Sequence, residues 1–280
     1  MIALSSPRLA RLSGLLILAF VATSVEASAD GPIRVRVLSY NIHHGEGVDG
    51  KVDLERLARV IKATEPDLVS LQEVDRNTQR TSKVDQPAEL ARLTGMHVFF
   101  GWNIPYQGGD YGNAILSKHP IKLTRNHKLP SFYKNEQRGV IEAEIDFPGF
   151  KTPLLFLTTH LDYRGQSQER PASVKKIAEV IAASPADRPT LLAGDLNDRI
   201  GSETLRGFDA DWTRVSPEEQ PTFPVDKPTR QIDFILTRPA KTWKVIEARV
   251  LDEAVASDHR AYFAVLEWQP LPPKVESPAK

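Results

Sequence analysis

Apolar runs that end abruptly in polar side chains recur along this 280-residue chain, and they constrain the fold more than any other feature. The clearest example is 191–198, where Leu-Leu-Ala is followed by Gly-Asp-Leu-Asn-Asp. Residues i and i+2 of a strand lie on one face, so this pattern predicts that Asp195 and Asn197 are presented together. Taken alone, the same residues also fit a strand followed by an Asx-type turn without any chemical role.

The polar residues at these strand ends and adjoining turns are oxygen or imidazole donors, and the chain contains no cysteine. They are Asn41, Glu73, His160, Asp162, Asp195, Asn197, Asp233, Asp258 and His259. Oxygen-rich donor sets favour hard divalent cations. The histidines are suited to act as general acid, general base or phosphate donor.

Strand patterns outnumber helix patterns about two to one by the periodicity criteria. Amphipathic stripes predict helices at 52–64, with Asp53 as N-cap, and at 171–183, and a short helix is expected at 87–94. The strand–helix–strand order of 33–75 is typical of an α/β crossover. Mixed alternating and continuously apolar strands favour two packed β-sheets with helices outside, an α/β (α+β) architecture.

Two further segments carry specific expectations. The sequence 105–112, rich in glycine and tyrosine, predicts a loop whose aromatic rings either stack on a substrate or cover the sheet edge. The run 140–146 alternates apolar and acidic residues, which predicts a strand with one solvated face.

The two ends of the chain are expected to lie outside the folded domain, which we place at 30–268. Arg8 and Arg11 precede the apolar run 12–25, and Ala-Ser-Ala follows at 27–29, a pattern typical of a signal peptide cleaved near Ala29. An uncleaved anchor is the alternative, although the run is short for a membrane span. Cleavage implies export to the periplasm or the medium. The proline-rich stretch 269–280 predicts a loose tail.

The charge balance limits the partners. Lys and Arg number 36 and Asp and Glu also number 36, so the formal net charge is zero. Such a chain lacks the strong basic field that holds a polyanion without sequence preference. A basic cluster at Arg164, Arg170, Lys175 and Lys176 gives weak support for DNA binding. We expect a monomer without a strong nucleic-acid-binding signature.

Seven short motifs occur in the order found in one known family. They are Ser-Tyr-Asn-Ile-His-His-Gly (39–45), Leu-Gln-Glu-Val-Asp (71–75), Gly-Asn-Ala-Ile-Leu-Ser (112–117), Thr-His-Leu-Asp (159–162), Gly-Asp-Leu-Asn-Asp (194–198), Ile-Asp-Phe-Ile (232–235) and Ser-Asp-His (257–259). Over about 33–268 the chain resembles the endonuclease/exonuclease/phosphatase superfamily. The resemblance implies a four-layered α/β sandwich, with two mostly antiparallel sheets flanked by helices. It also implies phosphoester cleavage with a divalent metal, Mg²⁺ or Mn²⁺.

The resemblance also implies roles for individual residues. Glu73 would be the main metal ligand, supported by Asn41 and Asp258. The implied catalytic residues are His160, Asp195, Asn197, Asp233 and His259. Among them, His160 would donate to the scissile phosphate or the leaving oxygen, and Asp195 would orient or deprotonate the attacking water. Asn197 would hold that water or a phosphate oxygen. His259, oriented by Asp233, would bind the phosphate.

Phosphate or substrate contacts are expected from His43, Asn113, Arg138 and Asp162. His43 stands where nuclease members often have an acidic ligand, and this resembles the branch that includes sphingomyelinases. Arg138 fits a surface charge equally well.

The function implied is a secreted, divalent-metal-dependent hydrolase of phosphoester bonds, a phosphodiesterase or phosphatase in which water attacks in line. A nuclease on DNA or RNA, a sphingomyelinase-like lipid phosphodiesterase and a non-catalytic binding module on the same scaffold are the alternatives.

Overall fold

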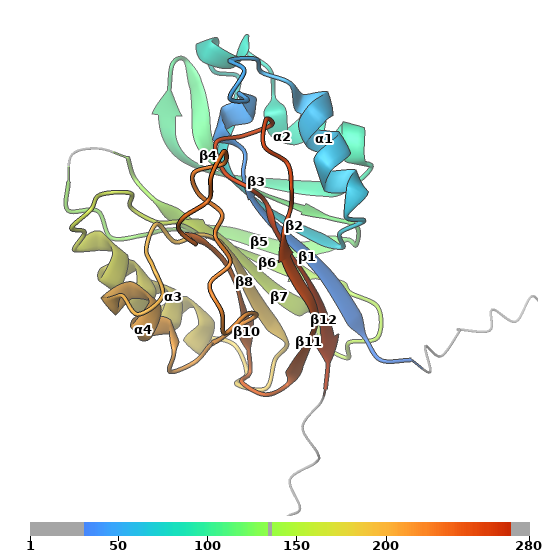
Figure 1. Ribbon diagram of the computed structural model, residues 1–280. Helices are drawn as coiled ribbons and strands as arrows, with labels where there is room; N and C mark the ends of the chain where they lie inside the picture. The colour runs from blue at the N-terminus through green and yellow to red at the C-terminus, as the bar shows by residue number, and fades with distance from the viewer. Residues whose placement is uncertain (1–30, 134–135, 270–280) are drawn as a thin grey trace, which may run out of the picture. The chain divides into compact units, whose positions relative to one another are not determined.

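The structure is a computed structural model that describes residues 31–133 and 136–269 (Figure 1). The expected signal peptide and, apart from Gln269, the expected tail lie outside the described residues. Helices in the described part are α1 (Leu54–Ala63), α2 (Gln86–Thr94), α3 (Glu169–Ala182) and α4 (Glu203–Phe208), with short 3₁₀ turns at His43–Gly45 and Gln79–Thr81. Among these helices, none has the length and apolar character needed to cross a membrane.

The strands of the described residues form two six-stranded sheets. The first sheet has the order β11-β12-β1-β2-β4-β3 and contains β1 (Arg34–Asn41), β2 (Leu68–Arg76), β3 (His97–Tyr106), β4 (Gly109–Ser117), β11 (Trp243–Val250) and β12 (Tyr262–Trp268). The second sheet has the order β5-β6-β7-β8-β10-β9 and contains β5 (Ile121–Lys128), β6 (Gly139–Ile145), β7 (Leu154–His160), β8 (Thr190–Asp195), β9 (Thr213–Arg214) and β10 (Asp233–Arg238).

Each sheet is antiparallel except for one central pair of strands. β1 and β2 run parallel and are joined through α1, and β7 and β8 run parallel and are joined through α3. Parallel neighbours need a long crossover, which a helix supplies. The predicted crossover within 33–75 and the two mostly antiparallel sheets are therefore confirmed.

The helices cover the outer faces of the two sheets, so that the described chain has four layers (Figure 1). α1 begins after Asp53, whose carboxylate accepts a hydrogen bond from the Arg56 backbone N–H at 2.8 Å, as the sequence predicted. The apolar stripe of α1 packs on the first sheet, and the stripes of α3 and α4 pack on the second.

A third apolar core lies between the sheets. Its central members are Val35, Val37, Leu68, Ile115, Ile141, Phe156, Leu191, Ala193 and Ile235. Strand alternation decides which residues enter this core. In β1, for example, Val35 and Val37 face the second sheet, whereas Leu38 and Tyr40 join the core beneath α1.

Some expectations were wrong. β3 and β4 continue through most of 105–112, and the turn is confined to Gln107 and Gly108. The sequence analysis also missed β5 and α4. The acidic face of 140–146 is solvated only in part: Asp146 is exposed and Glu144 is half-buried, whereas Glu142 is buried and bonds His127 at 2.7 Å. His127, a half-buried residue of the neighbouring strand β5, takes the place of water as the hydrogen-bond partner of Glu142.

Candidate active site

Three of the predicted residues lie in one row across the second sheet. His160 ends β7 and is paired in register with Asp195 at the end of β8, and Asp195 is paired with Asp233 at the start of β10. All three continue the face that packs against the first sheet, since Phe156, Ala193 and Ile235 precede or follow them at even spacing. The apolar core between the sheets therefore ends in a row of polar side chains.

Gly194 allows β7 and β8 to approach where this row is formed. A Cβ atom at Gly194 would lie 2.0 Å from the backbone oxygen of Thr159, so no other residue fits without moving the strands. The close approach brings His160 Nε2 to 3.4 Å from Asp195 Oδ2. In the Gly-Asp pair of the motif, Gly194 thus permits the close approach of the strands, and Asp195 lies beside His160 as a result.

Glu73 reaches the site through an irregularity in β2. The pairing of β2 with β4 shifts register between Leu71 and Val74, which is a β-bulge, and Glu73 has a left-handed φ of 60°. Regular alternation would place Gln72, not Glu73, on the face shared with Leu68. The bulge re-aims the Glu73 carboxylate, and this costly backbone conformation is of the kind that accumulates at functional sites.

Asn41 connects the two sheets at this point. Its Nδ2 donates to Glu73 Oε1 at 3.0 Å and to Asp195 Oδ2 at 3.1 Å, and its Oδ1 accepts from the His43 backbone N–H at 3.1 Å. The side chain is fully buried, so all of these bonds are shielded from water. Asn41 thus links Glu73 of the first sheet to Asp195 of the second sheet by hydrogen bonds.

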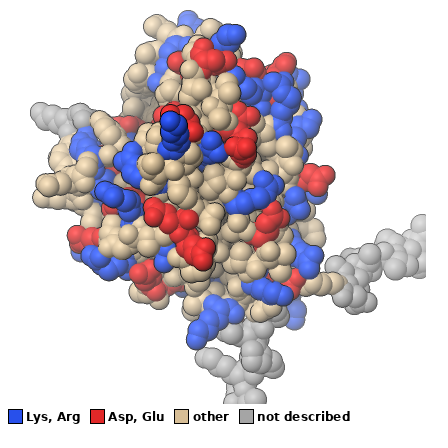
Figure 2. Space-filling model, viewed as in Figure 1, with Lys and Arg blue, Asp and Glu red and all other residues tan. Residues whose placement is uncertain are grey.

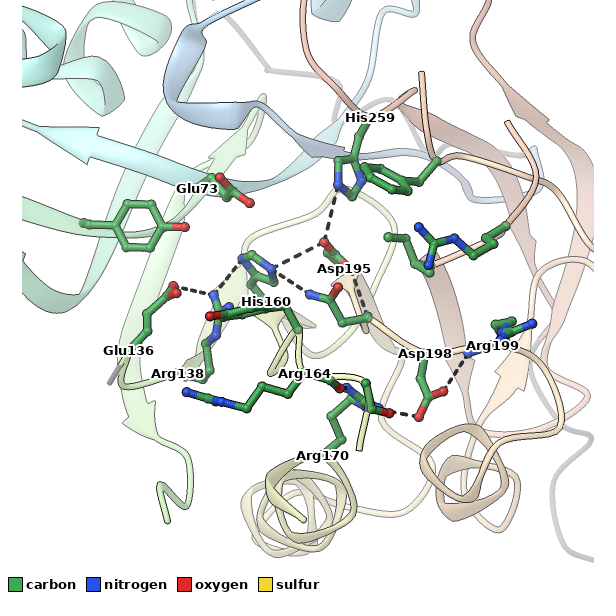
Figure 3. A pocket seen from close by; sticks show the side chains of 17 residues that line it. Glu73, Glu136, Arg138, His160, Arg164, Arg170, Asp195, Asp198, Arg199 and His259 are labelled. Carbon is green, nitrogen blue, oxygen red and sulfur yellow. Dashed lines mark hydrogen bonds and ion pairs between the residues drawn. The ribbon is translucent and has the colours of Figure 1, made fainter. Parts of the chain in front are cut away.

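A cavity of about 520 Å³ opens above these residues (Figure 3). It is lined by Glu73, Tyr111, Glu136, Arg138, His160, Tyr163, Arg164, Gly165, Arg170, Asp195, Asn197, Asp198, Arg199, Phe223, Arg230, Ile232 and His259. Of the residues predicted from the sequence, Glu73, Arg138, His160, Asp195, Asn197 and His259 are in this lining.

His259 and Asp233 form a buried dyad. His259 Nδ1 lies 2.9 Å from Asp233 Oδ2, which also accepts from the Thr222 hydroxyl at 2.6 Å. Burial opposes a charge on the ring, but the charge and hydrogen bond of Asp233, followed by the charge of Asp195, raise the pKa of His259 to about 10. The cavity therefore contains an imidazolium at neutral pH, with Nε2 3.8 Å from Asp195 Oδ2.

Asp195 is the carboxylate on which these contacts converge. Burial, and then the charge of Asp233, raise the pKa of Asp195 to about 7, against the charge of His259 and hydrogen bonds from Asn197 and Asn41. The Asn197 backbone N–H donates to Asp195 Oδ1 at 2.9 Å, and Asn197 has a left-handed φ of 51°. β8 ends at Asp195, so the two residues meet through an Asx-type turn and not through strand alternation.

His160 is neutral and has two donors beside it. Burial, then the charges of Arg138 and His259, hold the pKa of His160 well below its usual range. Arg138 Nη1 lies 3.0 Å from Nδ1, and Asn197 Nδ2 lies 2.9 Å from Nε2. A neutral imidazole accepts one hydrogen bond and donates one. The ring can therefore accept from only one of the two, and the N–H of the other lacks an acceptor in the ring. Asn197 Nδ2 also donates to the Leu161 carbonyl oxygen at 3.1 Å.

Six predicted residues are not in the cavity lining. Asn41 and Asp233 lie directly behind it, bonded to lining residues. The other four are His43, Asn113, Asp162 and Asp258. His43 Nδ1 lies 3.1 Å from the Glu46 carbonyl oxygen, and Asn113 donates to the Gly139 carbonyl oxygen at 3.3 Å. Asp162 pairs with Arg164, and Asp258 Oδ1 accepts from the Ser257 hydroxyl at 3.4 Å.

The sequence analysis missed several lining residues. Glu136 pairs with Arg138, and Asp198 accepts from Arg170 Nε at 3.1 Å. Asp198 is the last residue of the motif at 194–198, so the motif is a signal that could have identified it. Glu136, Arg199 and Arg230 lie in segments without a strand or helix pattern, so only the tertiary structure brings them to the cavity.

Two places have donors suited to a divalent cation. Atoms of Asp195, Asp233 and His259 lie within 4.8 Å of one another. However, a metal needs a neutral imidazole, and His259 is charged and already bonded to Asp233. The Glu73 carboxylate fits better, because it lines the cavity and no lysine or arginine of residues 31–133 or 136–269 pairs with it. Its carboxylate oxygens are ligands that hard cations prefer. The Asn41 amide directs Nδ2 at Glu73 and Oδ1 at the His43 backbone N–H, so it would have to turn over to add an oxygen ligand beside Glu73.

The chain belongs to the Endonuclease/Exonuclease/phosphatase family, whose sequence model matches residues 38–259. Members of this family are generally phosphoester hydrolases and typically depend on a divalent metal. The uncharacterized protein YbhP of Escherichia coli strain K12 is 28% identical over 232 residues, which cover 75% of this chain and 90% of that protein.

Solved structures agree with this assignment. A crystal structure of an endonuclease/exonuclease/phosphatase from Beutenbergia cavernae has a TM-score of 0.71 and 26% identity, covering 84% of this chain and 72% of that one. A mannosyl-6-phosphatase from Bacteroides thetaiotaomicron has a TM-score of 0.68 and 17% identity, covering 83% and 99%. The second likeness shows the shared fold alone, and the predicted four-layered sandwich is confirmed.

Proposed function

We propose that the protein is a divalent-metal-dependent phosphoester hydrolase that is exported from the cell. The observation that carries the proposal is the convergence on one cavity of a bulged carboxylate, Glu73, and a buried imidazolium–carboxylate dyad, His259 and Asp233. The first group suits a cation and the second suits a phosphate oxygen. Export rests on the signal-peptide pattern of residues 1–29.

The phosphate would be bound by cationic and neutral donors of the second sheet and its loops. His259 supplies a fixed positive charge, and whichever of Arg138 and Asn197 does not donate to the His160 ring supplies an N–H for a second oxygen. Fixed donors in a site partly shielded from water stabilise the charge that develops on phosphate oxygens during attack.

Asp195 would accept the proton of the attacking water. Its raised pKa, about 7, matches a general base that works near neutral pH. Its Oδ2 atom accepts from Asn41 and faces both histidines, so the carboxylate is held in one orientation. His160, neutral and facing the cavity, would donate a hydrogen bond to the scissile phosphate or the leaving oxygen.

Glu73 and Asn41 would hold the metal ion, and Asp258, which lies outside the cavity lining, is the weaker candidate for support. A bound Mg²⁺ or Mn²⁺ would neutralise charge on the phosphate and on the leaving oxygen. Glu73 has no arginine or lysine partner among the described residues, which makes it the carboxylate best placed for this purpose.

The test is hydrolysis of bis-(p-nitrophenyl) phosphate and p-nitrophenyl phosphate by the chain that begins at residue 30, with Mg²⁺, Mn²⁺ or EDTA. We expect turnover that EDTA removes and that falls at least about a thousandfold in Glu73→Gln and His259→Ala. Glu144→Gln, which breaks a pair with Arg188 outside the cavity, is the matched control and should keep its activity. Turnover that survives both site variants would contradict the assignment.

A further inference from the structure

The five arginines that line the cavity fall into two groups. Three of them are ion-paired: Arg138 with Glu136, Arg164 with Asp162, and Arg170 with Asp198. The charge of these arginines is largely balanced by their carboxylate partners. They therefore shape the cavity wall more than they add positive potential to it.

Arg199 and Arg230 are different. Both line the cavity and are exposed, and neither guanidinium has a carboxylate partner within residues 31–133 or 136–269. Apart from the dyad of the site, they are the cations of the lining whose charge is not balanced nearby. An unpaired guanidinium offers several N–H donors in a planar fork suited to phosphate or carboxylate.

The backbone of each of these arginines is anchored. The Arg199 backbone N–H donates to Asp198 Oδ1 at 3.0 Å, and Asp198 Oδ2 in turn accepts from Arg170 Nε and from the Thr204 hydroxyl. Arg230 and Phe223 exchange two backbone hydrogen bonds of 3.0 Å. The two charged groups thus extend from fixed points, and less conformational entropy is lost when they bind.

The backbones of Arg199 and Arg230 both lie near the strand ends that carry Asp195 and Asp233. Arg199 follows β8 and Arg230 precedes β10, at the edge where Asp195 and Asp233 are paired. The Arg230 guanidinium lies 5.0 Å from the centroid of the Phe223 ring, which packs against His259 with the ring centroids 4.8 Å apart. In Figure 3, Arg199 and Glu73 lie on opposite sides of Asp195.

We propose that Arg199 and Arg230 form a second anion subsite, so that the substrate is a small phosphoester carrying a further phosphate or carboxylate group. The proposal rests on the proposed function, because it takes the scissile phosphate to lie at His259 and His160. The second anionic group would extend away from Glu73, along the carboxyl end of β8 and the start of β10.

The charge distribution favours a small substrate over a nucleic acid. Lysines, arginines and acidic residues are interspersed on the face shown in Figure 2, and the formal net charge of the chain is zero. A polyanion would need a basic track that follows its backbone beyond the cavity. Two arginines without a carboxylate partner among the described residues, in the lining of a cavity of about 520 Å³, instead match one additional anionic group on a small substrate.

The test compares matched ligands by calorimetric titration of the chain that begins at residue 30, in EDTA. The pairs are fructose 6-phosphate with fructose 1,6-bisphosphate, and adenosine 5′-monophosphate with adenosine 3′,5′-bisphosphate. We expect the bisphosphate to bind about tenfold or more tightly than its partner in at least one pair. Arg199→Gln and Arg230→Gln should each reduce that ratio, and the double variant should abolish it.

The control is Arg34→Gln, at the end of β1 that lies away from Asn41. It should leave the ratio of bisphosphate to monophosphate affinity unchanged. A wild-type ratio near one in both pairs, or a ratio that survives the double variant, would overturn the subsite. Arginine-dependent binding of a single-stranded DNA oligonucleotide tighter than that of either bisphosphate would also overturn it. Because binding is measured without metal, a failure of the second anion subsite can be distinguished from a failure of the proposed hydrolase function, which is measured as turnover of p-nitrophenyl phosphates.

Discussion

The two sheets have the same plan and make different contributions to the cavity. Each has one parallel pair joined by a helix, and each presents polar residues where that pair ends. The first sheet supplies Asn41 and Glu73, a donor set dominated by oxygen atoms. The second supplies His160 and Asp195, joined by Asp233, where imidazole and carboxylate bond each other.

The difference shows that a repeated backbone arrangement provides places for side chains, while the chemistry arises where the two sheets meet. Asn41 bonds Asp195 from one sheet to the other, and His259, which precedes β12 of the first sheet, bonds Asp233 of the second. Neither sheet alone holds both the Glu73 carboxylate, which we propose binds the cation, and the His259–Asp233 dyad, which we propose binds the phosphate. Substitutions of residues from either sheet can test whether the two sheets make these separate contributions.

The largest effect is expected from Asp233→Asn, which keeps the shape of the dyad but removes its charge. Without the carboxylate, His259 loses the group that keeps it protonated, and turnover should fall about 10³- to 10⁴-fold. The measurement is kcat for bis-(p-nitrophenyl) phosphate. Asp75→Asn, a buried carboxylate paired with Arg80 in the first sheet, is the matched control and should retain most activity. Equal losses in the two variants would contradict the special role of the dyad.

A smaller loss of activity is expected from Asn41→Ala, which cuts the contact between the sheets. Glu73 and Asp195 each lose a donor, so kcat should fall about 10²-fold and the free energy of unfolding by about 1–3 kcal/mol. Asn126→Ala removes a comparable amide, bonded to the Trp102 carbonyl oxygen, away from the cavity. It should lower stability without lowering kcat. Unchanged kcat in Asn41→Ala would show that the sheets act independently.

The dyad should also make stability depend on pH. The pKa of His259 is raised in the folded state to about 10 from an ordinary value near 6.5, so its stabilisation is present below the lower value and is lost as pH rises through the higher one. Between pH 8 and 10 the free energy of unfolding in EDTA should decrease by about 2 kcal/mol. Asp233→Asn should flatten this decrease, while titration of other groups is common to both proteins. Parallel curves would be evidence against a charged His259.

The smallest effect is expected far from the contact between the sheets. Arg34 at the start of β1 pairs with Glu267 of β12 at 3.0 Å, and its side chain is 55% exposed. Because exposed ion pairs are weak, Arg34→Ala should change the free energy of unfolding in urea by less than about 1 kcal/mol and leave kcat unchanged. A change above about 2 kcal/mol would mean that the distal end of the first sheet is coupled to the site.

Much of the fold could be predicted from the sequence, because short-range physics determines it. The N-cap of α1, the stripes of α1 and α3 and the apolar runs that become β7 and β8 are local patterns with one favourable solution. The ordered motifs also identified Glu73, His160, Asp195 and His259 before the structure brought them to one cavity.

Local sequence patterns do not determine the structure where a backbone irregularity or a partner distant in the sequence decides the outcome. Alternation would place Glu73 on the wrong face of β2, and only the bulge opposite β4 turns it toward Asn41. Asn197 meets Asp195 through a turn and not along a strand. Glu142 is buried because β5 supplies His127, from a strand that the sequence pattern did not indicate.

The sequence by itself thus determined the helices, most of the strands and the types of residue that end them, since these follow from periodicity and capping within a few residues. The tertiary structure decided which of those ends share a cavity and how their pKa values shift, since both depend on burial and on charges far apart in the chain. The positions of Arg199 and Arg230 are among the features that only the tertiary structure decided. They lie in segments without a pattern, and the pairing of β8 with β10 brings them to one edge.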